Sequence, residues 1–183
     1  MRKWKTLTSE YLHKSPFVDI RKDSCELPNG IVIEDYFVNE YSDWVNAIVI
    51  TKEEKIVLVE QFRYAANDFF LEVPAGRSED NETQNEAILR EIKEETGYIS
   101  EKKPILLGEF YINPATQNNK VSSYLIVDAY PAFEQNLDPT EFIEVKLFDI
   151  EEISKSINSG EINHLFSVNA FNLYKAYLNN VNN

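Results

Sequence analysis

The stretch that decides the fold is residues 76–98, which read GRSEDNETQNEAILREIKEETGY. Within it, apolar side chains recur at Ala87, Ile88 and Ile92, the spacing expected for one face of a helix. This spacing predicts a helix over residues 82–96, and Gly97 is placed to end it in a left-handed conformation. The segment therefore reads as one amphipathic helix between two loops.

Three glutamates crowd the last turns of this helix. Glu91 and Glu95 are four residues apart with Glu94 between them, so their carboxylates share one face. Like charges at this spacing destabilise a helix by ~0.2–0.5 kcal/mol per pair, and negative charge near the helix C-terminus opposes the macrodipole. A bound divalent cation reverses both effects, and hard oxygen ligands favour Mg²⁺ or Mn²⁺. The alternative is a solvated acidic surface, which is common in acidic proteins.

The fixed residues of this stretch match a known motif in type and spacing. The chain resembles the Nudix hydrolase family, because the Nudix box is matched at every position by Gly76, Glu82, Arg90, Glu91, Ile92, Glu94, Glu95 and Gly97. Tyr98 stands where the family usually has an aliphatic residue, a departure that affects packing more than chemistry. Residues 59–66 and 71–76, and Pro114 sixteen residues after Tyr98, are similar to the branch of ADP-ribose pyrophosphatases and nucleoside diphosphate sugar hydrolases.

This resemblance implies a fold and a metal site. The expected fold class is α+β, an α/β/α sandwich around a mixed sheet in which the box forms a loop–helix–loop. The resemblance places Glu91, Glu94 and Glu95, with the backbone carbonyl of Ala75, as ligands of Mg²⁺, with Mn²⁺ as the alternative. Arg90 is expected to pair with Glu94 and orient the glutamates. The implied reaction is metal-dependent cleavage of a pyrophosphate bond, which yields a nucleoside monophosphate and a sugar phosphate.

Several residues outside the box are candidates for substrate contacts. Arg63 has the fork of donors that matches phosphate oxygens, although a surface arginine at a strand end is the alternative. Trp44 and Tyr64 are large rings near strand ends that can stack on a nucleobase, or else serve as packing residues. Gln117 and Asn118 lie in the loop that follows Pro114 and can bond sugar hydroxyls, unless they are ordinary polar loop residues.

The sequence differs from this branch of the family at the residue expected to act as the general base. Many ADP-ribose hydrolases carry a glutamate in the loop after the downstream proline, but residues 114–120 contain no carboxylate. An amide takes no proton at neutral pH. Either a box glutamate such as Glu94 serves as the base, or bound metal activates the water without one.

The rest of the chain predicts one main domain of strands and helices. Strands are expected at residues 17–21, 31–38, 44–51, 55–62, 69–73, 105–112, 121–129 and 142–148, and further helices at residues 150–160 and 167–178. Pro28, Asn29 and Gly30 form a turn signal between the first two strands. We therefore expect an N-terminal β-hairpin region over residues 1–40 and the Nudix domain over residues 41–183. By resemblance, the hairpin region is expected to form a homodimer.

The amino-acid composition limits the classes of binding partner that we expect. With 18 basic and 31 acidic residues the net charge is −13, which argues against nucleic acid and anionic membranes as partners. Cys25 is the one cysteine, and no apolar stretch is long enough for a signal peptide or a membrane span, so we expect a cytoplasmic protein. The leading hypothesis is a nucleotide-sugar hydrolase. The alternatives are another Nudix substrate, such as NADH, a dinucleoside polyphosphate, an oxidised nucleotide or capped RNA, and a non-catalytic binding module.

Overall fold

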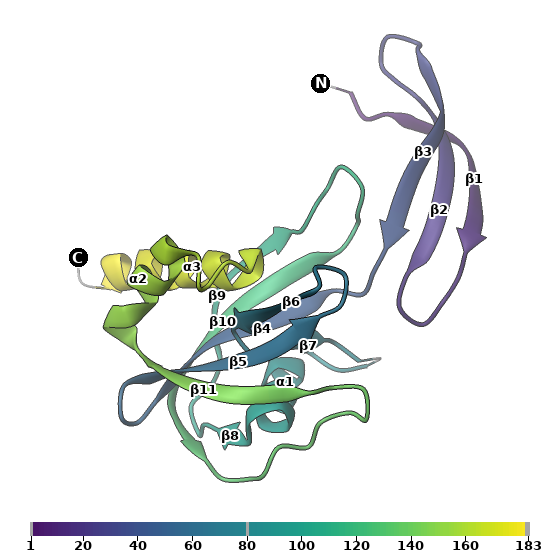
Figure 1. The fold of residues 1–183 in the computed structure, drawn as a ribbon. Helices are drawn as coiled ribbons and strands as arrows, with labels where there is room; N and C mark the ends of the chain where they lie inside the picture. Colours follow the sequence, from purple (N-terminus) through teal and green to yellow (C-terminus); the bar gives the residue numbers. More distant parts are fainter. Residues whose placement is uncertain (1, 80, 182–183) are drawn as a thin grey trace. The chain divides into compact units, whose positions relative to one another are not determined.

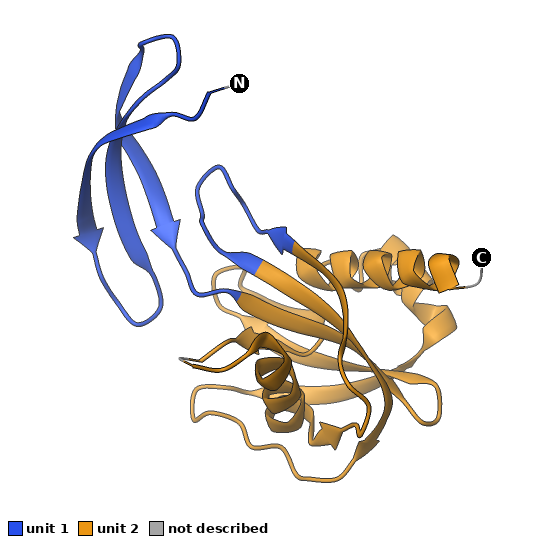
Figure 2. Cartoon of the chain, turned by 180° about the vertical axis from the view of Figure 1, so that it is seen from behind, with its two compact units in different colours: residues 1–43, 110–120 blue, residues 44–109, 121–183 orange. Residues whose placement is uncertain are grey.

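A computed structural model describes residues 2–79 and 81–181. The chain divides into two compact units (Figure 2). Unit 1 comprises Met1–Asp43 and Phe110–Lys120, and unit 2 comprises Trp44–Glu109 and Val121–Asn183. The segment 110–120, which contains the Pro114 loop, therefore groups with the N-terminal strands although it lies between two strands of the main sheet.

Unit 1 contains a three-stranded antiparallel sheet in the order β1-β2-β3 (Figure 1). Its strands are β1 (Lys5–His13), β2 (Asp19–Glu26) and β3 (Val32–Glu40). The expected hairpin corresponds to β2 and β3, and Gly30 turns the chain between them with a φ of 83°. Strand β1 was not predicted. Every residue of β1 is exposed. A strand with no buried face does not need alternating apolar and polar residues, and that alternation is the pattern by which a half-buried strand is predicted.

Unit 2 is built on a mixed sheet of eight strands. Four central strands follow the order β11-β5-β4-β10, in which β4 and β10 are parallel and the other two pairs are antiparallel. The remaining strands extend this sheet at its edges and ends. The strand bounds are β4 (Trp44–Thr51), β5 (Lys55–Arg63), β6 (Asp68–Glu72), β7 (Ala75–Arg77), β8 (Tyr98–Ile99), β9 (Ile105–Tyr111), β10 (Lys120–Pro131) and β11 (Ile143–Asp149).

Helices cover both faces of this sheet (Figure 1). Helix α1 (Gln84–Thr96) packs on one face, while α2 (Ile150–Ser159) and α3 (Leu165–Val181) pack on the other. Strand β4 is buried on both sides, so its alternating side chains enter two separate cores. One core contains Val45, Ala47 and Val49 with α1, and the other contains Ile48 with α2 and α3. The expected α+β sandwich is confirmed.

Helix α1 begins and ends at residues with clear capping roles. Thr83 is the N-cap and forms a capping box with Glu86, so the helix starts at Gln84 and not at Glu82 as the sequence suggested. Gly97 ends it with a φ of 73°, as expected. Among the described residues, no helix is both long and apolar enough to span a bilayer.

Candidate functional site

Strand β7 brings the loop before α1 against the helix itself. In the register of β4 and β7, Gly76 lies opposite Val45, whose side chain faces the core beneath α1. A Cβ atom on Gly76 would lie 2.0 Å from the carboxyl carbon of Glu91. Only glycine leaves room for the carboxylate here, so the first residue of the box sets the position of one of its glutamates.

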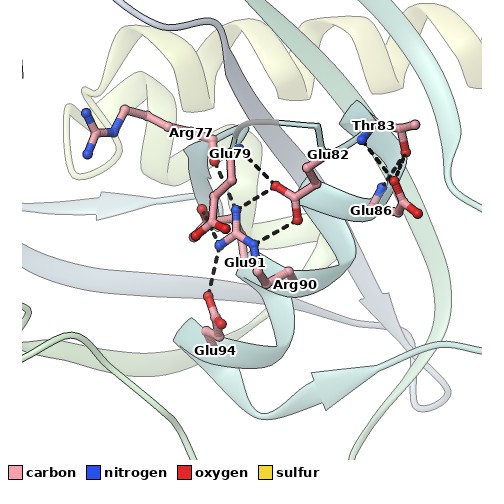
Figure 3. A network of polar contacts seen from close by, with 8 residues as sticks. All are labelled: Arg77, Glu79, Glu82, Thr83, Glu86, Arg90, Glu91 and Glu94. Carbon is pink, nitrogen blue, oxygen red and sulfur yellow. Dashed lines mark hydrogen bonds and ion pairs between the residues drawn. The ribbon is translucent and has the colours of Figure 1, made fainter. Parts of the chain in front are cut away.

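Arg90 is the centre of the polar network on α1 (Figure 3). Its Nε and Nη2 atoms donate to the two carboxylate oxygens of Glu82 at 2.9 and 3.0 Å. Its Nη1 atom donates to Glu91 and to Glu94, both at 2.9 Å. Nη2 also donates to the backbone carbonyl of Arg77 at 3.0 Å. The expected Arg90–Glu94 pair is confirmed, and a single guanidinium offsets the repulsion of three carboxylates.

Glu95 is the most buried of the glutamates on this helix, with 4% of its surface exposed. Its Oε2 atom accepts a hydrogen bond from the backbone nitrogen of Ala75 at 3.0 Å. Burial raises the pKa of Glu95 well above its usual range, against the lowering effect of the Ala75 bond. Burial also raises the pKa of Glu91. Two carboxylates that are costly to ionise therefore lie beside strand β7.

The donor set fits a hard divalent cation. Glu91, Glu94 and Glu95 supply carboxylate oxygens, and positive charge would relieve the cost of ionising the two buried ones. Over the described residues, no group of three or more histidine, cysteine, aspartate and glutamate side chains is drawn together closely enough to hold a metal. Glu91 and Glu94 are instead both bound by the Nη1 atom of Arg90.

Arg63 lies at the end of β5 with its guanidinium fixed by a buried acid. Its Nε and Nη2 atoms donate to Oε1 and Oε2 of Glu72 at 2.8 and 2.6 Å. The charge of Glu95 contributes to raising the pKa of Arg63, and the charge of Arg63 contributes to lowering the pKa of Glu95. The two side chains therefore interact electrostatically. Arg63 is thus paired with Glu72 and interacts electrostatically with Glu95 on α1.

Glu141 is a residue that the sequence analysis missed. It lies in the segment before β11, and its charge raises the pKa of Glu91, Glu95 and Arg63. Its carboxylate accepts a hydrogen bond from the backbone nitrogen of Asp138 at 3.2 Å. Nothing in the sequence distinguishes it from the other acids of that segment, because its position depends on the pairing of β11 with β5 and on bonds from residues 132–136 to the end of α1.

The other predicted substrate residues lie on three different segments of the chain. Trp44 is half-buried at the start of β4, opposite Arg77 of β7. Tyr64 follows β5 in the turn to β6 and is 89% exposed. Gln117 is half-buried and Asn118 is exposed, and both belong to unit 1, whereas the glutamates of α1 belong to unit 2.

Comparison with known families identifies the family of this chain. The model of the NUDIX domain matches residues 42–166. The chain belongs to the Nudix family. A second model, the nucleoside diphosphate sugar hydrolase N-terminal domain, matches residues 4–39. The resemblance found from the box is therefore confirmed over most of the chain, and Nudix hydrolases generally need a divalent metal ion.

Individual relatives agree with this assignment. The chain is 32% identical to the ADP-ribose pyrophosphatase of Bacillus subtilis over 86% of this chain and 85% of that protein. It is 31% identical to the methanol dehydrogenase activator of Bacillus methanolicus with the same coverage. A crystal structure of an ADP compounds hydrolase matches with a TM-score of 0.84 at 18% identity, over 98% of this chain and 96% of that one. This last likeness shows that the Nudix fold is shared.

Proposed function

We propose that this Nudix enzyme hydrolyses the pyrophosphate bond of a nucleoside diphosphate sugar, with ADP-ribose preferred and sugars of the GDP-mannose type as alternatives. The observation that carries the proposal is the set of glutamates on α1: Glu95 is buried and Glu91 half-buried against strand β7, and Arg90 binds Glu91 and Glu94. The similarity to an ADP-ribose pyrophosphatase over most of both chains supports the substrate class.

The metal in this proposal is Mg²⁺, with Mn²⁺ able to replace it. Glu91, Glu94 and Glu95 would hold it together with the backbone carbonyl of Ala75. When bound, such an ion neutralises the diphosphate and lowers the pKa of a coordinated water. Arg90 keeps the glutamates oriented and their mutual repulsion low until the ion arrives.

The chain's own residues complete the reaction. Arg63 binds diphosphate oxygens with the donors that Glu72 leaves available. A water oxygen bonds to one phosphorus, the bond from that phosphorus to the bridging oxygen breaks, and the water's proton passes to a carboxylate. We assign this base role to Glu141 in preference to Glu94, because Arg90 already binds Glu94, whereas Glu141 is exposed in the segment that Gln135 and Asn136 join to the end of α1.

Four further residues are proposed to determine substrate specificity. Trp44 and Tyr64 are assigned to the nucleobase, and the exposure of Tyr64 supports a stacking role for its ring. Gln117 and Asn118 are assigned to the terminal sugar. Replacing both amides with alanine is expected to change the ranking of nucleotide sugars without changing the metal requirement. An unchanged ranking would remove them from the site.

A homodimer formed through unit 1 is part of the proposal. Exposed apolar side chains are unusually frequent on and beside the three-stranded sheet, which suits a surface that is covered by a second copy. They are Trp4, Leu7, Tyr11, Leu12, Phe17, Ile31, Val32 and Phe37. We also propose the domain division at residues 40 and 41, and a cytoplasmic location consistent with the lone thiol of Cys25.

A panel of substrates tests the reaction class. The purified protein is incubated with Mg²⁺ and ADP-ribose, ADP-glucose, GDP-mannose, UDP-glucose, NADH, diadenosine polyphosphates and nucleoside triphosphates, and phosphomonoester release is measured with added phosphatase. Turnover of ADP-ribose or another nucleotide sugar above the rest supports the proposal. Turnover of triphosphates or dinucleotides alone would assign the chain to another Nudix substrate, and no turnover would favour a binding module.

A second function is favoured by one comparison. The methanol dehydrogenase activator matches this chain as extensively as the ADP-ribose pyrophosphatase does. The same site in this chain would then act during the activation of an alcohol dehydrogenase. Adding the protein with Mg²⁺ to a purified methanol dehydrogenase and following methanol oxidation tests this role, and an unchanged rate would exclude it for that dehydrogenase.

A further inference from the structure

A buried polar chain connects the start of α3 to Arg63. Its centre is Glu72, whose side chain is 1% exposed. Taking a carboxylate out of water costs several kcal/mol unless it is paired and hydrogen-bonded. Arg63 provides the pairing through two parallel bonds, from Nε at 2.8 Å and from Nη2 at 2.6 Å. This bidentate contact fixes the plane of the guanidinium as well as its position.

The contact leaves Arg63 able to bind a ligand. A guanidinium carries five N–H donors, and the two bonds to Glu72 use one on Nε and one on Nη2. The side chain of Arg63 is 39% exposed, so its outer edge reaches solvent while its inner edge faces Glu72. Orientation by Glu72 therefore decides where the remaining donors point.

The start of α3 holds Glu72 on its other side. The Nδ1 atom of His164 lies 3.3 Å from Oε2 of Glu72 and 3.1 Å from Oγ of Ser167. Ser167 is fully buried, and its Oγ accepts a hydrogen bond from the backbone nitrogen of Val73 at 3.0 Å. The same two residues thus contact the carboxylate of Glu72 and the peptide that follows it.

His164 is itself held in place by aromatic rings. Its ring centroid lies 5.2 Å from that of Phe166 and 6.4 Å from that of Phe70, both with edge-to-face geometry. Its Nδ1 atom is paired with Oγ of Ser167 and lies 3.3 Å from Oε2 of Glu72, and a proton on Nδ1 would suit this contact because a carboxylate only accepts. The imidazole is therefore held against the carboxylate of Glu72.

We propose that His164 and Ser167 are positioning residues, which hold Glu72 so that Glu72 presents Arg63 to the diphosphate of the substrate. This inference rests on the proposed function for the role of Arg63. It gives a purpose to a buried ion pair that stability alone does not explain, since apolar residues of similar volume often stabilise a protein as well or better.

The charge state of His164 suits this role. Burial lowers its pKa, the charge of Glu72 opposes that effect, and the charge of Arg63 reinforces it. At neutral pH the ring is therefore neutral. It contacts Glu72 without adding a second cation that competes with Arg63 for the same carboxylate.

The linkage is tested first without any substrate. The chain has two histidines, His13 on the exposed strand β1 and His164, so nitrogen-detected NMR resolves both imidazoles and His13 serves as the internal reference. We expect His164 to be the Nδ1–H tautomer. Glu72→Gln should lower the pKa of His164 further, and Arg63→Met should raise it. A His164 spectrum that responds to neither substitution would overturn the proposal.

Kinetics then separate positioning from support of the fold. His164→Leu removes the donor, whereas His164→Asn keeps an N–H near the place of Nδ1. We expect His164→Leu to raise the KM for ADP-ribose about tenfold with a smaller change in kcat, and His164→Asn to restore most of the difference. In an Arg63→Lys background, His164→Leu should add little, because the geometry that it protects has already gone.

Two results would overturn the positioning role. One is an equal rise in KM from His164→Leu in both backgrounds. The other is a loss of melting temperature with KM unchanged. Should the unaltered protein hydrolyse none of the substrates tested, the proposed function would fail, while the NMR measurement would still decide whether His164, Glu72 and Arg63 are linked.

Discussion

At the scale of single residues, the candidate site contains several acidic side chains whose negative charge is compensated by few cationic or hydrogen-bonding groups. Arg90 compensates Glu82, Glu91 and Glu94, while Glu95 relies on the peptide of Ala75. The roles of Arg90 and Gly97 could be predicted from spacing, because both act within one helix. The partnership of Arg63 with Glu72 and the presence of Glu141 could not, because they arise from strand pairing.

The burial of Glu95 predicts how the metal-free protein responds to pH. Its folded-state pKa is raised, so the folded chain binds a proton over a range where the unfolded chain has lost it. The stability of the wild type should therefore fall as pH rises from the ordinary glutamate pKa through the raised one. Thermal unfolding in EDTA should show this slope for the wild type and a weaker slope for Glu95→Gln. Identical slopes would contradict the raised pKa.

The closeness of Gly76 to Glu91 predicts a selective loss of activity. Gly76→Ala places a Cβ atom 2.0 Å from the Glu91 carboxyl carbon, so the carboxylate must move. We expect at least a tenfold loss of turnover but little loss of stability, because the atoms that must move are the end of a flexible side chain. Steady-state kinetics and urea unfolding measure the two effects. Gly160→Ala is the matched control, since its φ of 82° is strained for alanine but no atom lies within 4 Å. It should lose about 1 kcal/mol of stability and keep full activity.

At the scale of elements, α1 depends on the segment that follows β10. The backbone nitrogens of Ala132 and Phe133 donate to the carbonyl of Gly97, and that of Asn136 donates to the carbonyl of Glu94. The side chain of Gln135 donates to the carbonyls of Glu95 and Ile143 at 2.6 and 3.2 Å. These bonds satisfy carbonyls at the helix end and tie α1 to the segment that carries Glu141.

Gln135 is therefore expected to affect both stability and catalysis. Gln135→Ala leaves two carbonyls without this donor and loosens the approach to Glu141, so we expect a loss of about 1–2 kcal/mol in unfolding free energy and a lower kcat. Asn136→Ala is the control, because Asn136 contributes its backbone nitrogen to α1. The two variants are compared by chemical denaturation and initial rates, and equal behaviour would refute the anchoring role.

Sequence patterns located most elements but not all. Strand β4 was predicted with its observed bounds, because its apolar run is buried on both faces of the sheet. Strand β1 was missed because it is polar and exposed throughout. The short strands β7 and β8 were also missed, since three and two residues are too few to carry a periodic pattern.

At the scale of the whole molecule, the exposed apolar residues of unit 1 predict a dimer. Sedimentation equilibrium should give twice the mass of one 21.3 kDa chain at micromolar concentration. Leu7→Glu with Phe37→Glu should shift the population toward monomer, because the charges would be buried in the interface. Lys3→Glu, which lies next to this apolar surface in sequence, controls for added charge. A wild type that sediments as a monomer would refute the proposed interface.

The reaction class was predictable from the sequence because the Nudix box is local, whereas specificity was not. The Pro114 loop groups with unit 1, whereas Glu141 and the glutamates of α1 belong to unit 2. The acids and amides that we propose for substrate choice therefore come from segments far apart in the chain. A sequence motif alone does not show which of these residues lie close together in the folded chain.

The most direct test of the central claim is product analysis after incubation of the protein with ADP-ribose and Mg²⁺. By phosphorus NMR, we expect AMP and ribose 5-phosphate in equal amounts, no reaction in EDTA, and at least about a hundredfold slower reaction with Glu95→Gln. Unchanged ADP-ribose with the wild type, or equal rates for the wild type and Glu95→Gln, would contradict the account.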